Sequence, residues 1–222
     1  MNSRKVATAM LASGLFIGLA GCSLMPNRGS VQPTSTYRID PQESAVEPLT
    51  LPAVCPDLRV VTPTAAPGFG GTAMRYSTAP FQIADFAYHR WTAPPAAMLG
   101  PVLVERLRAD GLFGHVLDAG SGGDAPLQLE TRLIDLTQVF VGQQSHIRLT
   151  VGSTLIDTAN NRTLATRRFA IEVASAPNPV AGVGATNQAI EQWLDKESAW
   201  LRQLSRSGLC SGIHGLQPTR EP

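Results

Sequence analysis

Three segments in the second half of the chain alternate apolar and polar residues with a period of two. This period places successive side chains on opposite faces of a β-strand. Each strand then has one apolar and one polar face, which is typical of an antiparallel sheet covered on one side only. The apolar positions are Leu127, Leu129 and Leu133 in the first segment, Ile147, Leu149, Val151 and Leu155 in the second, and Phe169, Ile171 and Val173 in the third.

Two details refine these three strands. In the first segment the apolar phase moves from Leu133 to Ile134 and Leu136, which predicts a β-bulge or a change of twist. Between the second and third segments, residues 158–161 read Thr-Ala-Asn-Asn. They predict a hairpin loop in which asparagine can adopt the left-handed conformation.

Two other segments carry the 3.6-residue period of an amphipathic helix. The first begins at Pro94 and Pro95, with Thr92 as candidate N-cap, and ends before Gly111, a typical C-cap residue. Its apolar stripe is Leu99, Leu103 and Leu107, and its outward-facing residues are Glu105, Arg106 and Arg108. The second is expected from about residue 183 to 207, with the stripe Ile190, Trp193, Leu194, Trp200, Leu201 and Leu204. The pattern predicts an α/β (α+β) two-layer sandwich, a mainly antiparallel sheet with two helices on one face.

Shorter β-rich runs precede these elements, at residues 37–39, 58–61, 74–76 and 81–91, and another follows the first helix at 113–117. Proline and glycine clusters separate them, most densely at 63–71. Glycines in that cluster are followed by neither a Lys-Ser/Thr pair nor a helix start, so a phosphate-binding loop is not indicated.

The amino-terminal residues form a secretory signal. Arg4 and Lys5 precede an apolar run from Val6 to Leu19, which is too short to span a bilayer, and Leu19-Ala20-Gly21-Cys22 follows. A cysteine at this position predicts a bacterial lipoprotein that is cleaved before Cys22 and acylated on its thiol. The alternative is an ordinary signal peptide with an accidental cysteine.

The chain therefore divides into a signal peptide (1–21), a flexible tether rich in Pro, Ser, Asn and Gly (22–36), a globular domain (37–207) and a C-terminal tail (208–222). Hydrophobic residues make up 43% of the sequence and charged residues 16%, which is typical of a globular protein. The net charge of +1 becomes −1 once Arg4 and Lys5 are removed with the signal (1 − 2). This charge excludes a basic surface for nucleic acid.

Two cysteines remain, Cys55 in a Pro-rich segment and Cys210 after the last helix. In the oxidising compartment of an exported protein they can form a disulfide that joins both ends of the domain to its core. Two unpaired thiols are the open alternative.

Residues with catalytic chemistry do not converge in this sequence. The four histidines are far apart without metal-ligand spacing, and the loop 119–123 lacks the Gly-x-Ser-x-Gly nucleophile motif. We therefore expect no enzyme, no metal and no cofactor. The histidines are His89, His115, His146 and His214.

Several motifs, in this order, resemble one protein family. They are Tyr-Arg-Ile-Asp-Pro at 37–41, Pro-Thr-Ala-Ala-Pro-Gly-Phe at 63–69, Met-Arg-Tyr at 74–76, Phe-Ala at 86–87, Arg-Trp-Thr-Ala-Pro-Pro-Ala-Ala-Met-Leu at 90–99 and Arg-Thr-Leu-Ala-Thr-Arg-Arg-Phe at 162–169. With the lipid-attachment motif, this pattern is similar to the ABC-type transport auxiliary lipoproteins, the lipoprotein partners of MCE-type and paraquat-inducible-type transport systems. Cys55, Cys210 and the tail lie outside the pattern.

The resemblance implies a non-enzymatic accessory of an ATP-driven system that moves lipids between envelope membranes. The lipid on Cys22 would hold the domain at the outer membrane, since no aspartate follows Cys22. The domain would dock a periplasmic MCE-domain protein and, through it, the ABC permease and ATPase. A lipoprotein that carries an apolar ligand in its own pocket and a structural envelope scaffold are the alternatives, and assembly into a homo-oligomer is open.

Overall fold

The computed structural model describes residues 32–41 and 53–210. The elements below all belong to the unit that begins at Pro33. The expected signal peptide, Cys22 and most of the tether therefore lie outside the described residues. The elements are β1 Ser35–Tyr37, β2 Leu58–Val60, β3 Thr64–Ala65, β4 Ala73–Ser77, β5 Ala84–Trp91, α1 Pro95–Asp110, β6 Val116–Leu117, β7 Leu127–Val141, β8 Gln144–Asp157, β9 Arg162–Ser175 and α2 Pro179–Arg206.

The three alternating segments are the long strands β7, β8 and β9, which pair antiparallel as consecutive hairpins. The predicted bulge is confirmed, because the register of β7 against β8 shifts between Leu133 and Asp135. Asn161, in the loop between β8 and β9, adopts the left-handed conformation with φ 48°. Alternation and loop composition therefore determine this half of the sheet.

The other edge of β7 is bordered by three short strands. β2 and β4 lie on the β-rich runs expected at 58–61 and 74–76, whereas β3 lies in the proline and glycine cluster where no strand was expected. β2 pairs with residues 127–129, β3 with 132–133 and β4 with 137–139, all parallel to β7. The chain between these strands and β7 contains α1, and such a crossover returns it to the same end of the sheet. β5 pairs antiparallel with β4, and β1 pairs parallel with β5 at the far edge.

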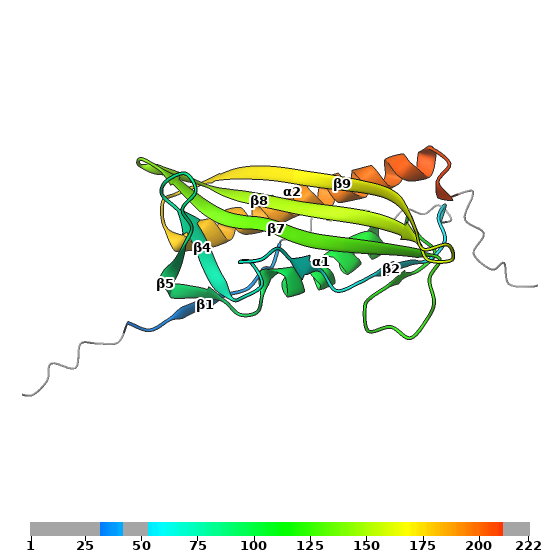
Figure 1. Ribbon diagram of the computed structural model, residues 1–222, viewed down its shortest axis with the longest axis horizontal. Coiled ribbons are helices and arrows are strands. Elements are labelled where there is room, and N and C mark those ends of the chain that lie inside the picture. Colours follow the sequence, from blue (N-terminus) through cyan, green and yellow to red (C-terminus); the bar gives the residue numbers. More distant parts are fainter. Residues whose placement is uncertain (1–31, 42–52, 211–222) are drawn as a thin grey trace, which may run out of the picture. The chain divides into compact units, whose positions relative to one another are not determined.

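Both helices cover one face of the sheet and leave the other face open, as Figure 1 shows. The expected two-layer α/β sandwich is therefore confirmed, with most residue pairs of the sheet antiparallel. Leucines of β7 and of α1 meet tryptophans of α2 in a single core. Its fully buried side chains include Leu103, Leu107, Leu127, Leu129, Leu133, Leu149, Ile190 and Trp193.

Some element boundaries differ from the prediction. α1 ends at the expected Gly111, with φ 63°, but it is capped at Pro94 and no side chain bonds its first turn, so Thr92 is not the cap. α2 begins at Pro179, earlier than expected, because the side chain of Asn178 accepts a hydrogen bond from the Ala181 amide. β5 begins at Ala84, so Phe81 lies in the loop before it.

Candidate functional site

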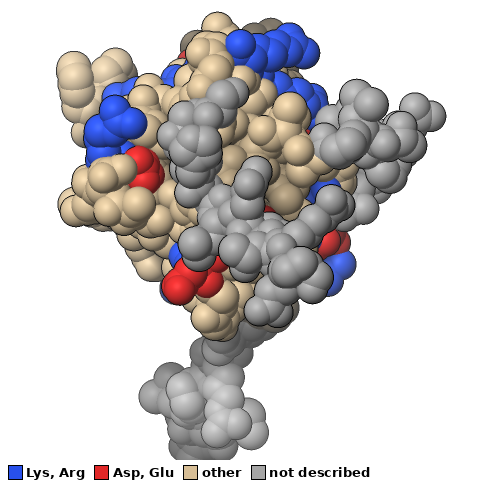
Figure 2. Space-filling view, turned by 90° about the vertical axis from the view of Figure 1, so that its right-hand side faces the viewer, with Lys and Arg blue, Asp and Glu red and all other residues tan. Residues whose placement is uncertain are grey.

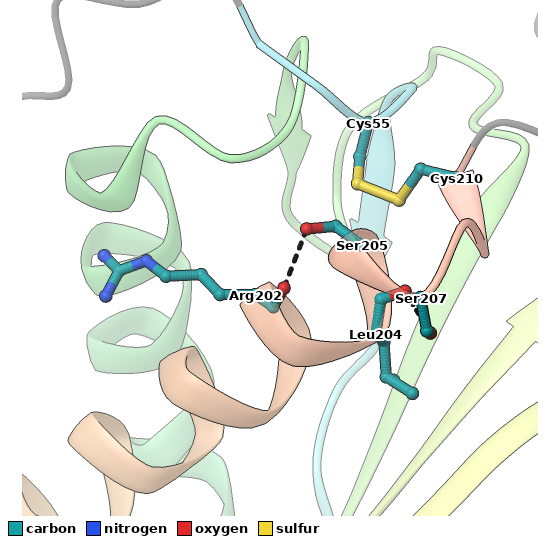
Figure 3. Close-up of a disulfide and its surroundings, with 6 residues drawn as sticks. All are labelled: Cys55, Arg202, Leu204, Ser205, Ser207 and Cys210. Carbon is teal, nitrogen blue, oxygen red and sulfur yellow. Dashed lines mark hydrogen bonds between the residues drawn. A yellow bond between two sulfur atoms is a disulfide. The ribbon is translucent and has the colours of Figure 1, made fainter.

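Of the candidate residues, Cys55 and Cys210 are brought together by the fold. A disulfide joins them, with their Cα atoms 5.0 Å apart, at the end of α2 (Figure 3). The Cys55 amide also donates to the carbonyl of Leu112, so the bridge connects the segment after α1 to the end of α2. Within residues 32–41 and 53–210, no group of three or more His, Cys, Asp or Glu is placed to hold a metal ion.

An open groove with a volume of about 360 Å³ lies beside α1. Three separate parts of the chain form it: residues 60–63 after β2, one side of α1, and the loop after β6. Its lining residues are Val60, Val61, Thr62, Pro63, Ala97, Gly100, Pro101, Val104, Glu105, Arg108, Asp118, Ala119 and Gly120. We call this surface the α1 groove.

The floor of the α1 groove depends on a close approach between helix and strand connection. A Cβ built on Gly100 would lie 3.0 Å from Cδ of Pro63, so glycine allows α1 to pack directly on that ring. Pro101 has no amide hydrogen and cannot donate to the carbonyl of Ala97 one turn earlier. Ala97 and Pro101 are both exposed, so the floor of the groove presents their apolar side chains beside the carbonyl oxygen of Ala97.

Charged residues form the other margin of the groove. Arg108 donates to Glu105 at 2.8 Å and lies 3.9 Å from a carboxylate oxygen of Asp118. The hydroxyl of Ser121 and the amide of Gly120 donate to Asp118 and lower the pKa of its carboxyl group, with a smaller contribution from Arg108. The groove therefore combines an apolar floor with a margin that carries both signs of charge.

Arg59 of β2 holds the loop 118–123 at this margin through hydrogen bonds. Its guanidinium donates to the carbonyls of Asp118, Ser121 and Gly123. Backbone carbonyls that lack regular secondary-structure partners are satisfied in this way. These hydrogen bonds hold the margin of the groove in place.

A buried carboxylate, that of Asp110, joins α1 to α2 through ion pairs. Asp110 is almost completely buried and accepts from Arg202 at 2.6 Å and from Arg106 at 3.4 Å. Arg106 also reaches Asp195 at 2.7 Å. The outward direction expected for Arg106 was wrong, because these carboxylates turn its guanidinium toward α2.

The interface between α2 and the sheet is filled by side chains. A cavity beside the first turns of α2, lined among others by Met74, Phe86 and Gly182, has a volume of only about 10 Å³. This volume suits at most a single water molecule. An enclosed site for a lipid chain is therefore not present at this position.

One titratable group inside this interface has an unusual environment. Glu197 of α2 has no exposed surface, and its Oε2 accepts hydrogen bonds from Ser153 Oγ at 2.8 Å and Trp193 Nε1 at 3.2 Å. Burial raises the pKa of its carboxyl group to about 7, although the two hydrogen bonds oppose the shift. Glu197 lines neither the α1 groove nor the cavity beside α2, so we assign it a role in the packing of α2 on the sheet.

The α1 groove could not be found from the sequence, because its lining comes from three separate segments, 60–63, 97–108 and 118–120, which only the fold brings together. The only local signals were Gly100 and Pro101 inside an otherwise regular helical pattern. Cys22, the principal candidate, lies outside the described residues, as does His214. None of the helices in the described part of the chain is long and apolar enough to cross a membrane.

Comparisons with known proteins agree with this architecture. The model of a family described as "ABC-type transport auxiliary lipoprotein component" matches residues 37–196. Among curated proteins the comparison found no significant match.

Solved structures show the same fold at low sequence identity. A protein from Xanthomonas campestris superposes with a TM-score of 0.67 at 18% identity, covering 78% of this chain and 98% of that one. A second, uncharacterised protein superposes with a TM-score of 0.55 at 16% identity, covering 79% and 99%. At these identities the likeness concerns the fold alone.

Proposed function

Because this chain belongs to the family of ABC-type transport auxiliary lipoprotein components, we propose that it is a periplasmic accessory lipoprotein anchored through Cys22. The acyl chains on Cys22 hold it at the outer membrane, since Ser23 rather than aspartate follows the anchor. It takes part, without catalysis of its own, in an MCE-type system that moves lipid between the envelope membranes. Its task is to dock the periplasmic MCE-domain protein, which connects to the permease and ATPase.

The observation that carries the docking proposal is the contrast between interior and surface. A ligand carrier needs an enclosed apolar cavity, typically of 300 Å³ or more, whereas the cavity under α2 has about 10 Å³. The larger space is the α1 groove, which opens to solvent on the outside of the molecule. A surface groove with a preformed margin favours binding of another protein over storage of a lipid.

The chemistry of the groove indicates what an MCE-domain partner would present. Ala97, Pro101 and Pro63 offer an apolar floor for one or two aliphatic or aromatic side chains. Glu105 and Arg108 can pair with flanking charges and fix the register of the partner. The partner segment would therefore be apolar at its centre and charged at its ends.

A pair of matched variants tests this proposal. Ala97→Arg places a long cation in the groove, and Ala199→Arg makes the same change at an exposed alanine of α2 outside it. We expect Ala97→Arg to reduce co-purification of the MCE-domain protein at least tenfold and to weaken the outer-membrane lipid barrier, while Ala199→Arg retains both. Equal binding by the two variants would contradict docking at this groove.

Membrane sorting needs a separate measurement. Separation of inner and outer membranes on a density gradient should place the mature protein in the outer-membrane fraction, and Cys22→Ala should release it. Recovery of the mature protein with the inner membrane would refute the sorting assignment and leave the docking surface unaffected.

The volume of the α1 groove favours a second candidate function, the binding of a small apolar ligand. The α1 groove has a volume within the range of small-ligand sites, as expected for a lipoprotein that binds an apolar ligand without a transport partner. Native mass spectrometry of the protein extracted from membranes distinguishes the two. A retained lipid that is lost in Ala97→Arg supports the carrier.

A further inference from the structure

Three loops meet at one end of the domain, at the left of Figure 1. They are residues 78–83 between β4 and β5, residues 141–144 between β7 and β8, and residues 176–181 at the start of α2. Ser77 of β4 pairs beside Val139 of β7. The side-chain amide of Gln138 donates to the carbonyl of Asn178 at 3.1 Å. We call the three loops together the apolar tip.

The apolar tip carries no charge. Residues 76–84, 136–147 and 173–190 contain no Asp, Glu, Lys or Arg. Four large hydrophobic side chains are nevertheless exposed on it: Phe81, Ile83, Val141 and Val180. The opposite end, near the disulfide, presents acidic and basic side chains among its uncharged surface (Figure 2). An uncharged patch with exposed large side chains marks a contact surface.

Phe81 is the most prominent residue of the tip. Its side chain is fully exposed, and its backbone has a φ of 66°, a left-handed conformation that is unfavourable for a bulky residue. Most positions of this kind are occupied by glycine or asparagine. A strained backbone that presents an aromatic ring to solvent indicates a use for the ring outside the fold.

The tip is supported by a rigid base. Gln138 is buried and donates to Ser145, Ser175 and backbone carbonyls of 176 and 178, which ties β7, β8, β9 and α2 together. Beside it the rings of Tyr76, Phe86 and Phe140 contact one another, with centroids 4.6 to 6.3 Å apart. The exposed side chains therefore project from a fixed frame.

The path of the chain into the domain shows where the anchor can lie. β1 runs parallel to β5 with Ser35 opposite His89, so the chain enters β1 from the side of Ala84, where β5 leaves the tip. His89 lies five residues from Ala84, about 17 Å along the strand. Cys22 precedes Ser35 by 13 residues, which span at most about 45 Å. A lipid on Cys22 can reach the same surface as the tip.

We propose that the apolar tip, with Phe81 at its centre, inserts into the lipid surface that holds the acyl chains of Cys22. This inference rests on the lipidation in the proposed function. Phospholipid headgroups and upper acyl chains are the occupant that suits exposed aromatic and aliphatic side chains without charge. Together, anchor and tip orient the domain. The helix that lines the α1 groove begins after the eight residues of β5, which separate it from the tip along the chain. The groove therefore stays accessible to a partner.

The test uses the full lipidated protein in phospholipid vesicles. Gln82→Cys beside Phe81 and Asn160→Cys in the loop between β8 and β9 are each labelled with an environment-sensitive nitrobenzoxadiazole probe, with the native disulfide intact. Both positions are exposed. We expect a blue-shifted emission at 82, and at least threefold stronger quenching by doxyl-labelled phospholipid at 82 than at 160. Phe81→Ser should remove most of this difference without changing flotation of the protein with vesicles.

Three other outcomes would overturn the proposal. Flotation with equal quenching at both positions would refute tip insertion and leave the lipid anchor intact. Failure to float would refute the anchor and with it the insertion that depends on it. Blue-shifted emission of the probe at position 82 without lipid quenching, together with a cross-link between two Gln82→Cys chains, would show that the tip contacts a second copy of this protein.

Discussion

Replacement of Glu197 by glutamine should change how stability depends on pH. The carboxyl group is fully buried, and the pKa is raised by that burial from an ordinary value of 4.5 to about 7. Glutamine keeps the shape and can accept from Ser153 and Trp193 as the carboxyl does. The amide nitrogen of glutamine replaces Oε1, which has no hydrogen-bond partner among the described residues, so the variant removes the ionisable group and adds a cost that does not depend on pH.

The number of protons bound by the folded and the unfolded protein determines whether stability rises or falls with pH. Between pH 4.5 and 7 the folded protein keeps a proton on Glu197 that the unfolded chain has released, so stability falls as the pH rises through this window and is constant above it. A difference of about 2.5 pKa units corresponds to about 3 kcal/mol. The free energy of unfolding of Glu197→Gln, relative to that of the wild type, should therefore rise by about 3 kcal/mol between pH 4.5 and pH 8.

Urea unfolding followed by tryptophan fluorescence between pH 4 and 8 measures this difference. With a denaturant slope of about 2 to 3 kcal/mol/M, the midpoint of Glu197→Gln, relative to that of the wild type, should rise by about 1 M between pH 4.5 and pH 8. Glu172→Gln, at an exposed position of β9, is the control and should leave the pH dependence unchanged. A gap between Glu197→Gln and wild type that is the same at every pH would refute the reasoning.

Three further stability predictions follow from contacts of the fold. Cys210→Ser removes the disulfide between two residues 155 positions apart and should lower the free energy of unfolding by up to about 5 kcal/mol. Thermal melts should show the same loss for the reduced wild type. Labelling of the wild type by thiol reagents before reduction would contradict the disulfide. Asp110→Asn weakens the buried contacts between α1 and α2 and should lower stability by about 2 kcal/mol in urea titrations, whereas an unchanged midpoint would contradict their importance. Gly182→Ala places a methyl group against the amide of Gln138 and should destabilise by about 1 to 2 kcal/mol; Gly184→Ala meets no neighbouring atom and should instead raise the melting temperature.

The sequence predicts the antiparallel half of the sheet because its information is local. β7, β8 and β9 are consecutive, their apolar residues alternate, and their hairpin loops carry Gly142 and Asn161 at positive φ. The extra residue of the bulge is visible as a phase slip. The strands parallel to β7 are different. β2, β3 and β4 have two to five residues, too few for a recognisable period, and their partner residues in β7 lie 62 to 69 positions away.

The helix boundaries illustrate where local rules compete. A proline can start a helix, and Pro94-Pro95 located α1 correctly, but Thr92 was too far from the first turn to cap it. At α2 the sequence Asn178-Pro179 is an equally good start, yet the glycines that follow it obscured the helical pattern. Tertiary contact with Gln138 stabilises this glycine-rich turn.

The α1 groove and the apolar tip depend on tertiary structure more than the helix boundaries do. The α1 groove requires Pro63 to pack on Gly100. The sequence predicts a strand from Phe81, whereas in the structure Phe81 lies in a loop at positive φ. The pairing of Cys55 with Cys210 was one of two alternatives, since spacing alone does not bring two residues 155 apart within 5.0 Å.

The central claim is that the α1 groove docks a periplasmic MCE-domain protein, and photocross-linking in intact cells tests it most directly. A photoreactive amino acid is introduced at Ala97 and, in a separate strain, at Ala199, and the covalent partners are identified by mass spectrometry. The account predicts a cross-link to an MCE-domain protein from position 97 and none from position 199. Capture of no MCE-domain protein from position 97, with the lipoprotein at its normal level, would contradict it.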